Sequence, residues 1–190
     1  MIIVLEGIDN AGKTTVATML CDYFSNRGIK ASISRELTTD VGDLIKSNVK
    51  EQKLSPITKA FLFAADRQIR LEQLGDIDNS DEIIIFDRYL HSAVVYREAE
   101  GLNGSWVKEL NRYVPSSDVS FYIDITPEES ISRNTDTKFN IRYTLDHLVK
   151  VRKSYMNYVS LGELILIDGM RDIKLVQEEI IDTLRRKGML

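Results

Sequence analysis

The chain has 190 residues, of which 43% are hydrophobic and 28% charged, a composition typical of an ordinary soluble globular protein and not of a disordered one. Its formal net charge of -4 and the lack of a polybasic block argue against binding to duplex nucleic acid, so we expect no nucleic-acid partner. The amino-terminal stretch MIIVLEG is too short and too acidic for a signal peptide or a membrane span, and we expect no membrane association.

The length and the lack of a linker predict a single domain over residues 1–190. Cys21 is the only cysteine, which excludes an internal disulfide and a cysteine zinc cluster. A chain of this kind fits a reducing compartment, and we expect a cytoplasmic protein.

Strand and helix patterns alternate along the chain. Short β-branched runs predict strands buried on both faces of a parallel sheet, namely IIVLE (2–6), KASISR (30–35), EIIIFD (82–87), VSFYID (119–124) and ELILID (163–168). Amphipathic stretches predict helices over 13–26, 40–49, 55–74, 90–98, 105–113, 127–133, 143–159 and 172–186. The sequence therefore predicts the α/β class, with a five-stranded parallel sheet flanked by helices.

The stretch GIDNAGKTT, residues 7–15, follows the first predicted strand and opens the first predicted helix. Gly7, Gly12, Lys13 and Thr14 satisfy the pattern G-x-x-x-x-G-K-[ST] of a phosphate-binding loop. Backbone N–H groups of such a loop face phosphate oxygens, while the lysine balances β/γ-phosphate charge and the threonine reaches Mg²⁺. We expect the loop to bind ATP through residues that also include Asn10, Ala11 and Thr15. The alternative is a glycine-rich turn without a ligand.

The run EIIIFDRY supplies a second half for such a site. Asp87 ends an apolar strand, where a carboxylate can hold Mg²⁺ or its water shell. An acid at a strand end can equally be a helix N-cap.

A GTPase-type switch shares the same loop but is disfavoured. Its Asp-x-x-Gly motif occurs only as Asp9 to Gly12, inside the loop, and TKFN ends in Asn140 where the guanine motif needs aspartate. Phosphoryl transfer to a small acceptor remains. Arg35, Arg67 and Arg88 lie beside the recognisable segments, and planar cations of this kind fix a monophosphate in line with the ATP γ-phosphate.

In four segments the chain resembles the thymidylate kinase family of P-loop nucleoside monophosphate kinases. EGIDNAGKTT is similar to the family's E-G-x-D-x-x-G-K-[ST]-T, FLFAADR to L-L-F-x-A-x-R, and SRELTTDVG to a shortened T-R-E-P segment, while DRYLHSAVVY keeps the Asp-Arg pair with the following serine and tyrosine. The resemblance runs through nearly the whole chain. It implies transfer of the ATP γ-phosphoryl group to dTMP, with ATP and Mg²⁺ as cofactors, in an enzyme that is usually a homodimer.

The resemblance also implies roles at the acceptor site. Phe63 would stack on the pyrimidine, and Arg67, one helical turn later, would hydrogen-bond the base. Arg35 and Arg88 would hold the acceptor phosphate. Three further residues complete the predicted acceptor set: Asp9, which would face the acceptor, Ser92, which would line the same wall, and Tyr96, which would close over the sugar.

A short lid is expected over about 133–142, between two predicted helices, where closure would exclude water from the transferring group. Arg133 and Lys138 would contribute charge there, Arg142 could substitute for Lys138, and Arg171 would sit near adenine. The expected catalytic set is Lys13, Asp9, Arg35, Asp87, Arg88 and Arg133. Two alternatives stay open: a P-loop kinase for another small acceptor, and a non-catalytic nucleotide-binding regulator.

Overall fold

The computed structural model describes residues 1–49, 54–77, 80–133 and 143–190. These residues form a five-stranded sheet in the order β2-β3-β1-β4-β5, and every neighbouring pair is parallel. The strands are β1 (Ile2–Glu6), β2 (Ala31–Arg35), β3 (Ile83–Asp87), β4 (Val119–Asp124) and β5 (Ile165–Asp168). The predicted α/β class and parallel sheet are confirmed, and the architecture is that of a P-loop kinase.

Helices connect the strands in alternation. They are α1 (Lys13–Ser25), α2 (Asp40–Val49), α3 (Pro56–Leu74), α4 (Leu90–Ala99), α5 (Gly104–Leu110), α6 (Pro127–Ser132), α7 (Leu145–Ser160) and α8 (Ile173–Arg186). Most bounds agree with the sequence patterns within two residues. The exception is α5, which ends at Leu110 where the pattern predicted helix to residue 113, because Asn111 leaves helical geometry and its amide caps the turn by donating to the carbonyl of Val107 at 2.8 Å.

Two helices begin with a capping hydroxyl residue followed by proline. Ser55 accepts from the backbone N–H of Thr58, and Pro56 follows as the first helical residue. Thr126 and Pro127 repeat the arrangement at α6. The start of α7 lies two residues later than predicted because Thr144 is its cap, accepting from the N–H of His147.

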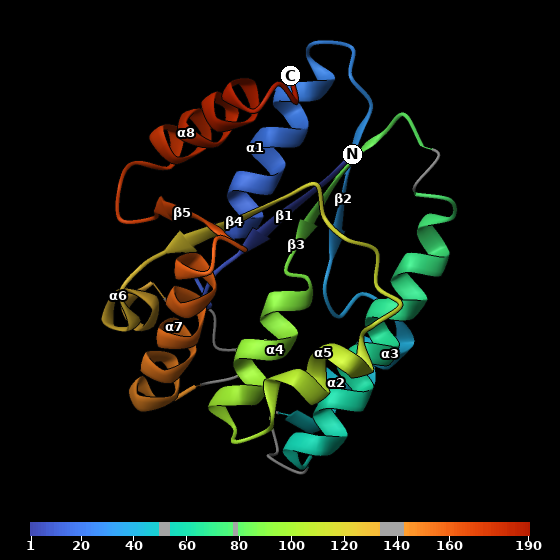
Figure 1. Ribbon diagram of the computed structural model, residues 1–190, viewed down its shortest axis with the longest axis vertical. Helices are drawn as coiled ribbons and strands as arrows, with labels where there is room; N and C mark the ends of the chain where they lie inside the picture. Colours follow the sequence, from blue (N-terminus) through green and yellow to red (C-terminus); the bar gives the residue numbers. More distant parts are fainter. Residues whose placement is uncertain (50–53, 78–79, 134–142) are drawn as a thin grey trace.

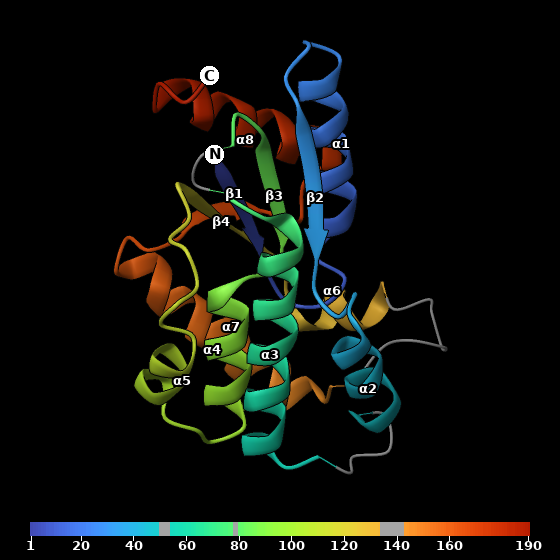
Figure 2. The same ribbon diagram turned by 90° about the vertical axis from the view of Figure 1, so that its right-hand side faces the viewer.

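The helices are divided between the faces and one end of the sheet. Figure 1 shows α1 and α8 together on one side, and in Figure 2 the strand arrows point toward the half of the molecule that contains α2, α3, α4 and α5. β1 lies between β3 and β4. Ligands of open α/β sheets bind in the crevice at the carboxyl ends of the strands, so the segments that follow β1 and β3 are placed to form a site.

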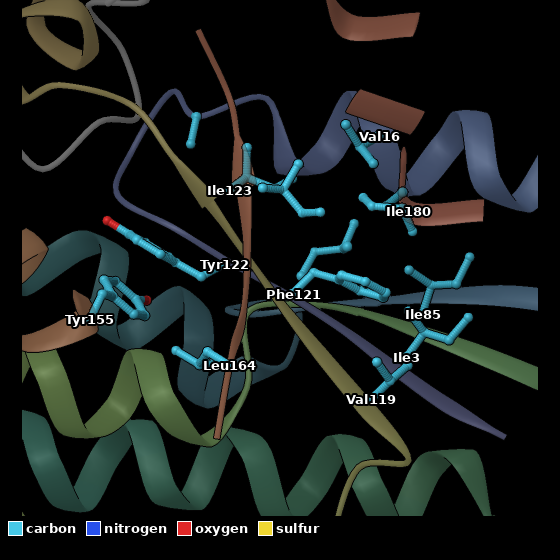
Figure 3. Packing of buried hydrophobic residues seen from close by; sticks show 14 of the residues in the cluster. Ile3, Val16, Ile85, Val119, Phe121, Tyr122, Ile123, Tyr155, Leu164 and Ile180 are labelled. Atoms are coloured by element: carbon cyan, nitrogen blue, oxygen red, sulfur yellow. The ribbon is translucent and has the colours of Figure 1, made fainter. Parts of the chain in front are cut away.

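The main core fills the space between the sheet and its helices. Ile3, Ile85 and Phe121 come from neighbouring strands and are fully buried, and Figure 3 shows them gathered with Val16 of α1 and Ile180 of α8. Elsewhere in the same core, Tyr122 of β4 stacks on Tyr155 of α7, with the two ring centroids 4.6 Å apart. β1, β3 and β4 are buried on both faces, which explains why they read as continuous apolar runs. The same prediction was wrong for β2 and β5, which are the edge strands of the sheet and are partly exposed.

Among the described residues, no helix is both long enough and apolar enough to cross a membrane.

Candidate functional site

The phosphate loop joins β1 to α1 and depends on its glycines. A Cβ on Gly7 would lie 2.7 Å from the carbonyl oxygen of Ile123 in β4, so no other residue fits there without displacing the backbone. Gly12 has φ 89°, in the left-handed region that glycine adopts at no steric cost, and it precedes the first residue of α1. The loop is therefore wrapped tightly around the amino end of a helix, where backbone N–H groups attract anions.

Lys13 lies within this loop and is only 6% exposed. Its Nζ donates to the carbonyl oxygen of Ile8 at 2.7 Å. Burial, together with the nearby charge of Arg88, lowers the pKa of Lys13 from 10.5 to about 8. A bound polyphosphate would place negative charge beside this buried ammonium group and stabilise its charged form, so the loop is suited to that ligand.

The two residues expected to hold the metal are in contact. The Thr14 hydroxyl donates to Oδ2 of Asp87, which joins the first turn of α1 to the end of β3. Thr15 is exposed beside Thr14. Hydroxyl and carboxylate oxygens are the hard donors that Mg²⁺ takes, with one or two protein ligands completed by water and substrate phosphates. The donor set therefore fits Mg²⁺.

Asp9 faces a pocket and not the inside of the phosphate loop. Its Oδ1 accepts from Nη2 of Arg88 at 2.6 Å, and its Oδ2 accepts from the Tyr96 hydroxyl at 3.3 Å. Nη1 of Arg88 donates to the Ser92 hydroxyl at 3.2 Å. Burial raises the pKa of Tyr96 well above its usual value, so the phenol keeps the proton that it donates. Four predicted acceptor-site residues thus form one hydrogen-bonded group.

These side chains face a small pocket with a volume of about 90 Å³, counted as room for the centre of a water-sized sphere. Asp9, Arg88, Ser92 and Tyr96 line it, and so does Phe63 from α3. We call it the acceptor pocket. Its lining combines a charged end at Arg88 with apolar surface from Phe63, the combination that a nucleotide requires.

Arg88 is aimed at the acceptor pocket by a strained backbone. Its φ of 73° lies in the left-handed region, which costs a non-glycine residue about 1–3 kcal/mol. Two hydrogen bonds hold it there: the N–H of Arg88 donates to the Leu5 carbonyl at 3.0 Å, and the N–H of Tyr89 donates to Oε1 of Glu6 at 3.1 Å. β1, which leads into the loop that carries Asp9, therefore also sets the direction of Arg88.

Arg67 is not among the residues that line this pocket. It is 0% exposed, and its terminal nitrogens donate to Asn111 Oδ1 at 2.7 Å, Glu36 Oε1 at 2.8 Å and the Tyr89 carbonyl at 3.3 Å. In this arrangement both ends of its guanidinium already have acceptors. Its predicted contact with the base remains a prediction.

Arg35 pairs in register with Asp87, the residue before Arg88, but it does not line the acceptor pocket. It is exposed at the end of β2 and lines a separate surface pocket with Ser34, Thr38 and Arg70. The structure does not bring Arg35 into the acceptor pocket, and its predicted hold on the acceptor phosphate remains a prediction.

Residues expected on the ATP side meet around Asn10. Asn10 has φ 60°, and its amide donates to the carbonyl of Ser130 in α6 at 2.9 Å. Arg133, which ends α6, lies within 3.5 Å of the Asn10 carbonyl and within 3.3 Å of the Gly169 carbonyl. Ala11 is buried inside the loop. Arg133 thus lies between the phosphate loop and the turn that follows β5.

Three other residues were predicted on the ATP side, and the structure describes one of them, Arg171. Arg171 follows that turn and is exposed, and its guanidinium pairs with Glu179 of α8 at 2.7 Å. Lys138 and Arg142 lie outside the described residues, as does the predicted lid apart from Arg133.

Sequence reasoning missed Glu6. It is 0% exposed and accepts four hydrogen bonds: Oε1 from the N–H groups of Tyr89 and Ser92, each at 3.1 Å, and Oε2 from the Ser92 hydroxyl and the Tyr155 hydroxyl, the latter at 2.9 Å. The carboxyl group therefore caps the amino end of α4 from a neighbouring strand. Its one sequence signal was its place before Gly7, in a strand of otherwise apolar residues.

Comparison with known proteins agrees with this geometry. The family model described as "Thymidylate kinase" matches residues 5–180. The chain is 33% identical over 186 residues to "Probable thymidylate kinase 1" of Saccharolobus solfataricus, with 97% of each chain covered. It is 36% identical over 197 residues to "Probable thymidylate kinase" of Thermococcus kodakarensis, with 95% of each covered. A model match across nearly the whole chain, together with full-length relatives, shows that the chain belongs to the thymidylate kinase family.

Proposed function

We propose that this kinase transfers the γ-phosphoryl group of ATP to dTMP, giving dTDP and ADP, with dTMP in the acceptor pocket and ATP on the loop at residues 7–15. The observation that carries the proposal is the pair between Asp9 and Arg88 at 2.6 Å. Asp9 belongs to the phosphate loop and Arg88 to the acceptor pocket, so one contact connects the two substrate sites.

Arg88 is the cation proposed to hold the acceptor phosphate. Its planar guanidinium can present two parallel N–H groups to phosphate oxygens, and Asp9 and Ser92 already fix its plane. The Arg88 guanidinium also lies 5.0 Å from the centre of the Tyr96 ring, which would shield the pair from solvent on that side. A monophosphate held here would lie next to the loop that holds the γ-phosphate.

Catalysis in this proposal is positioning and charge stabilisation. The attacking oxygen of the acceptor phosphate is already anionic, so no protein base is needed. Lys13 and Arg133 would stabilise charge on the transferring group from the loop and from α6. Thr14 and Asp87 would hold Mg²⁺, which would neutralise charge between the β- and γ-phosphates.

Three further statements belong to the proposal. The chain acts as one domain over residues 1–190, it forms a homodimer, and it works in the cytoplasm. Light scattering tests the dimer, and limited proteolysis tests the single domain.

A panel of nucleoside monophosphates tests the substrate. With ATP and Mg²⁺, ADP release is expected to be fastest with dTMP, because the Tyr96 ring would exclude a ribose 2′-hydroxyl and Phe63 would stack on a single pyrimidine ring. Coupled release of ADP is the measurement. Equal rates across the panel would indicate a kinase for another acceptor, and no turnover with any acceptor would indicate a regulator.

Asp9→Asn should separate the two substrates. The amide loses the charge that fixes Arg88, so we expect KM for dTMP to rise by about 10-fold while the Kd for ATP changes little. Steady-state kinetics with dTMP varied, and calorimetry with a non-hydrolysable ATP analogue, give the two constants. Asp22→Asn, at an exposed position of α1, is the matched control. Equal damage to both constants would contradict the division of roles.

A further inference from the structure

Asp66 of α3 is a fully buried carboxylate that holds the loop between β2 and α2, residues 36–39. Its Oδ2 accepts from the N–H of Leu37 at 3.0 Å, and its Oδ1 accepts from the Thr39 hydroxyl at 2.7 Å. The Thr39 hydroxyl in turn accepts from the N–H of Gly42 in α2 at 3.2 Å. One carboxyl group of α3 therefore connects this 36–39 loop to the start of α2.

The 36–39 loop forms one wall of the acceptor pocket. Glu36 and Leu37 both line that pocket, whereas Asp66 does not. Oε1 of Glu36 also accepts from Nη2 of Arg67 at 2.8 Å, so the loop helps to set where the Arg67 guanidinium lies. Asp66 can therefore act on the pocket only through the residues that it positions, and not by touching a ligand.

Leu37 has a backbone conformation that needs such support. Its φ of 63° lies in the left-handed region, which leucine keeps only where the surrounding structure holds it there. Gly42 packs directly on this residue: a Cβ at Gly42 would lie 2.5 Å from the Leu37 Cα and 2.8 Å from Oδ1 of Asp66. Without the hydrogen bond from its N–H to Asp66, Leu37 would relax toward negative φ, and the wall of the pocket would no longer be preformed.

A buried arginine fixes the carboxylate in turn. Nε of Arg70, one helical turn after Asp66, lies 3.4 Å from Oδ2 of Asp66, and both side chains are buried. Nη1 of Arg70 donates to the hydroxyl of Ser34 in β2 at 3.3 Å. A buried charge is costly unless it is paired, so the ion pair explains how a carboxylate is kept at this place. Asp66 is thereby held between α3 and β2.

We propose that Asp66 is a positioning residue that keeps the acceptor pocket preformed by holding the 36–39 loop in its strained conformation. The inference rests on the proposed function, since it concerns the affinity of this pocket for dTMP. When only a fraction of the molecules has the wall formed, the apparent dissociation constant of the acceptor rises by the inverse of that fraction. Lys13 and Arg88 are held by other contacts, so ATP binding and the chemical step should not depend on Asp66.

Asp66→Ala removes both acceptors from the loop. We expect KM for dTMP to rise by about 10- to 30-fold, as it would if about 3–10% of the molecules kept the wall formed, while kcat stays within about threefold. The Kd for a non-hydrolysable ATP analogue should not change. Asp66→Asn should restore most of the affinity, because its amide oxygen can accept from the Leu37 N–H and its amide nitrogen can donate to the Thr39 hydroxyl. Steady-state kinetics and calorimetry are the measurements.

Thr39→Val is a second variant, which tests the same loop if Asp66→Ala does not fold. It removes only the hydroxyl at a position of the same shape, so KM for dTMP should rise by about 3- to 10-fold. Thr39→Ser keeps the hydroxyl and should reverse that rise. Thr183→Val is the matched control, because Thr183 is also buried, and its hydroxyl accepts from Arg186 at 2.9 Å within α8. It should leave KM for dTMP unchanged.

A purely structural role would give a different pattern. If Asp66→Ala and Thr39→Val lower the melting temperature but leave KM for dTMP unchanged, measured well below that temperature, the inference is overturned. It is also overturned if kcat or the Kd for the ATP analogue changes as much as KM for dTMP. If the unmodified enzyme prefers another monophosphate to dTMP, the proposed function itself fails, and KM for that acceptor then decides the role of Asp66.

Discussion

Lys13→Ala is expected to lower kcat by about 10³-fold while the fold persists. The ammonium group lies inside the phosphate loop, 2.7 Å from the Ile8 carbonyl, where a transferring phosphoryl group would gather negative charge. Alanine supplies no charge there, and the low exposure of the site prevents water from taking its place. Single-turnover kinetics with saturating ATP and acceptor measure the chemical step without product release.

We expect the stability of the Lys13→Ala variant to change much less than its activity. Because burial lowers the pKa of Lys13 from 10.5 to about 8, the unfolded chain binds more protons between about pH 8 and pH 10.5, and the contribution of Lys13 to the free energy of unfolding rises with pH across that window. Below pH 8 the buried charge opposes folding, so its removal should cost little. Lys153→Ala, at an exposed position of α7, is the control for kcat. A Lys13 variant that kept kcat within about tenfold would contradict the assignment.

Glu6→Ala should be among the most destabilising single changes in the chain, lowering the free energy of unfolding by about 3–5 kcal/mol. The substitution leaves the buried N–H groups of Tyr89 and Ser92 without acceptors and opens a cavity beside Tyr155. It also releases the peptide that holds Arg88 at positive φ, so activity should fall with stability. Chemical denaturation monitored by circular dichroism gives the free energy.

Glu6→Gln is the matched variant, with an expected loss of only about 1–2 kcal/mol. The amide oxygen can still accept from both backbone N–H groups, and the amide nitrogen can donate to the hydroxyls of Ser92 and Tyr155, since a hydroxyl accepts as well as donates. Glu109→Ala, an exposed position, should stay within about 0.5 kcal/mol of the unmodified protein. If the glutamine and alanine variants lost equal stability, the four hydrogen bonds would not be the cause.

The fold could be predicted closely because its signals are local. The three central strands, β1, β3 and β4, are apolar runs that are buried on both faces, and residues such as Ser55 and Thr126 cap their helices with their own side chains. The family, and with it the kinase activity, also followed from short motifs and is confirmed. The predicted range of α5 was too long because the apolar spacing continues past Asn111, where an amide contact ends the helix.

The site was less predictable because its roles depend on contacts distant in sequence. A motif places Arg67 one turn after Phe63, but only the fold shows that Glu36 and Asn111 occupy its terminal nitrogens. Glu6 meets α4 across 83 to 86 positions of sequence, and no local pattern reports such a cap. Asp9 contacts Arg88 and Tyr96, two other residues of the predicted acceptor set, and its role toward the acceptor stays a prediction.

Helix α4 carries Ser92 near its start and Arg97 in its last turn. Its amino end is held to β1 by the hydrogen bonds of Glu6. Changes near Arg97 therefore lie far from the anchored end and need not disturb it. Substitutions at Phe63 or in the last turn of α4 would change the lining of the acceptor pocket without touching the end of α4 that Glu6 holds. Under the proposed function, the choice of acceptor could therefore change while the phosphate loop and Arg88 kept their places.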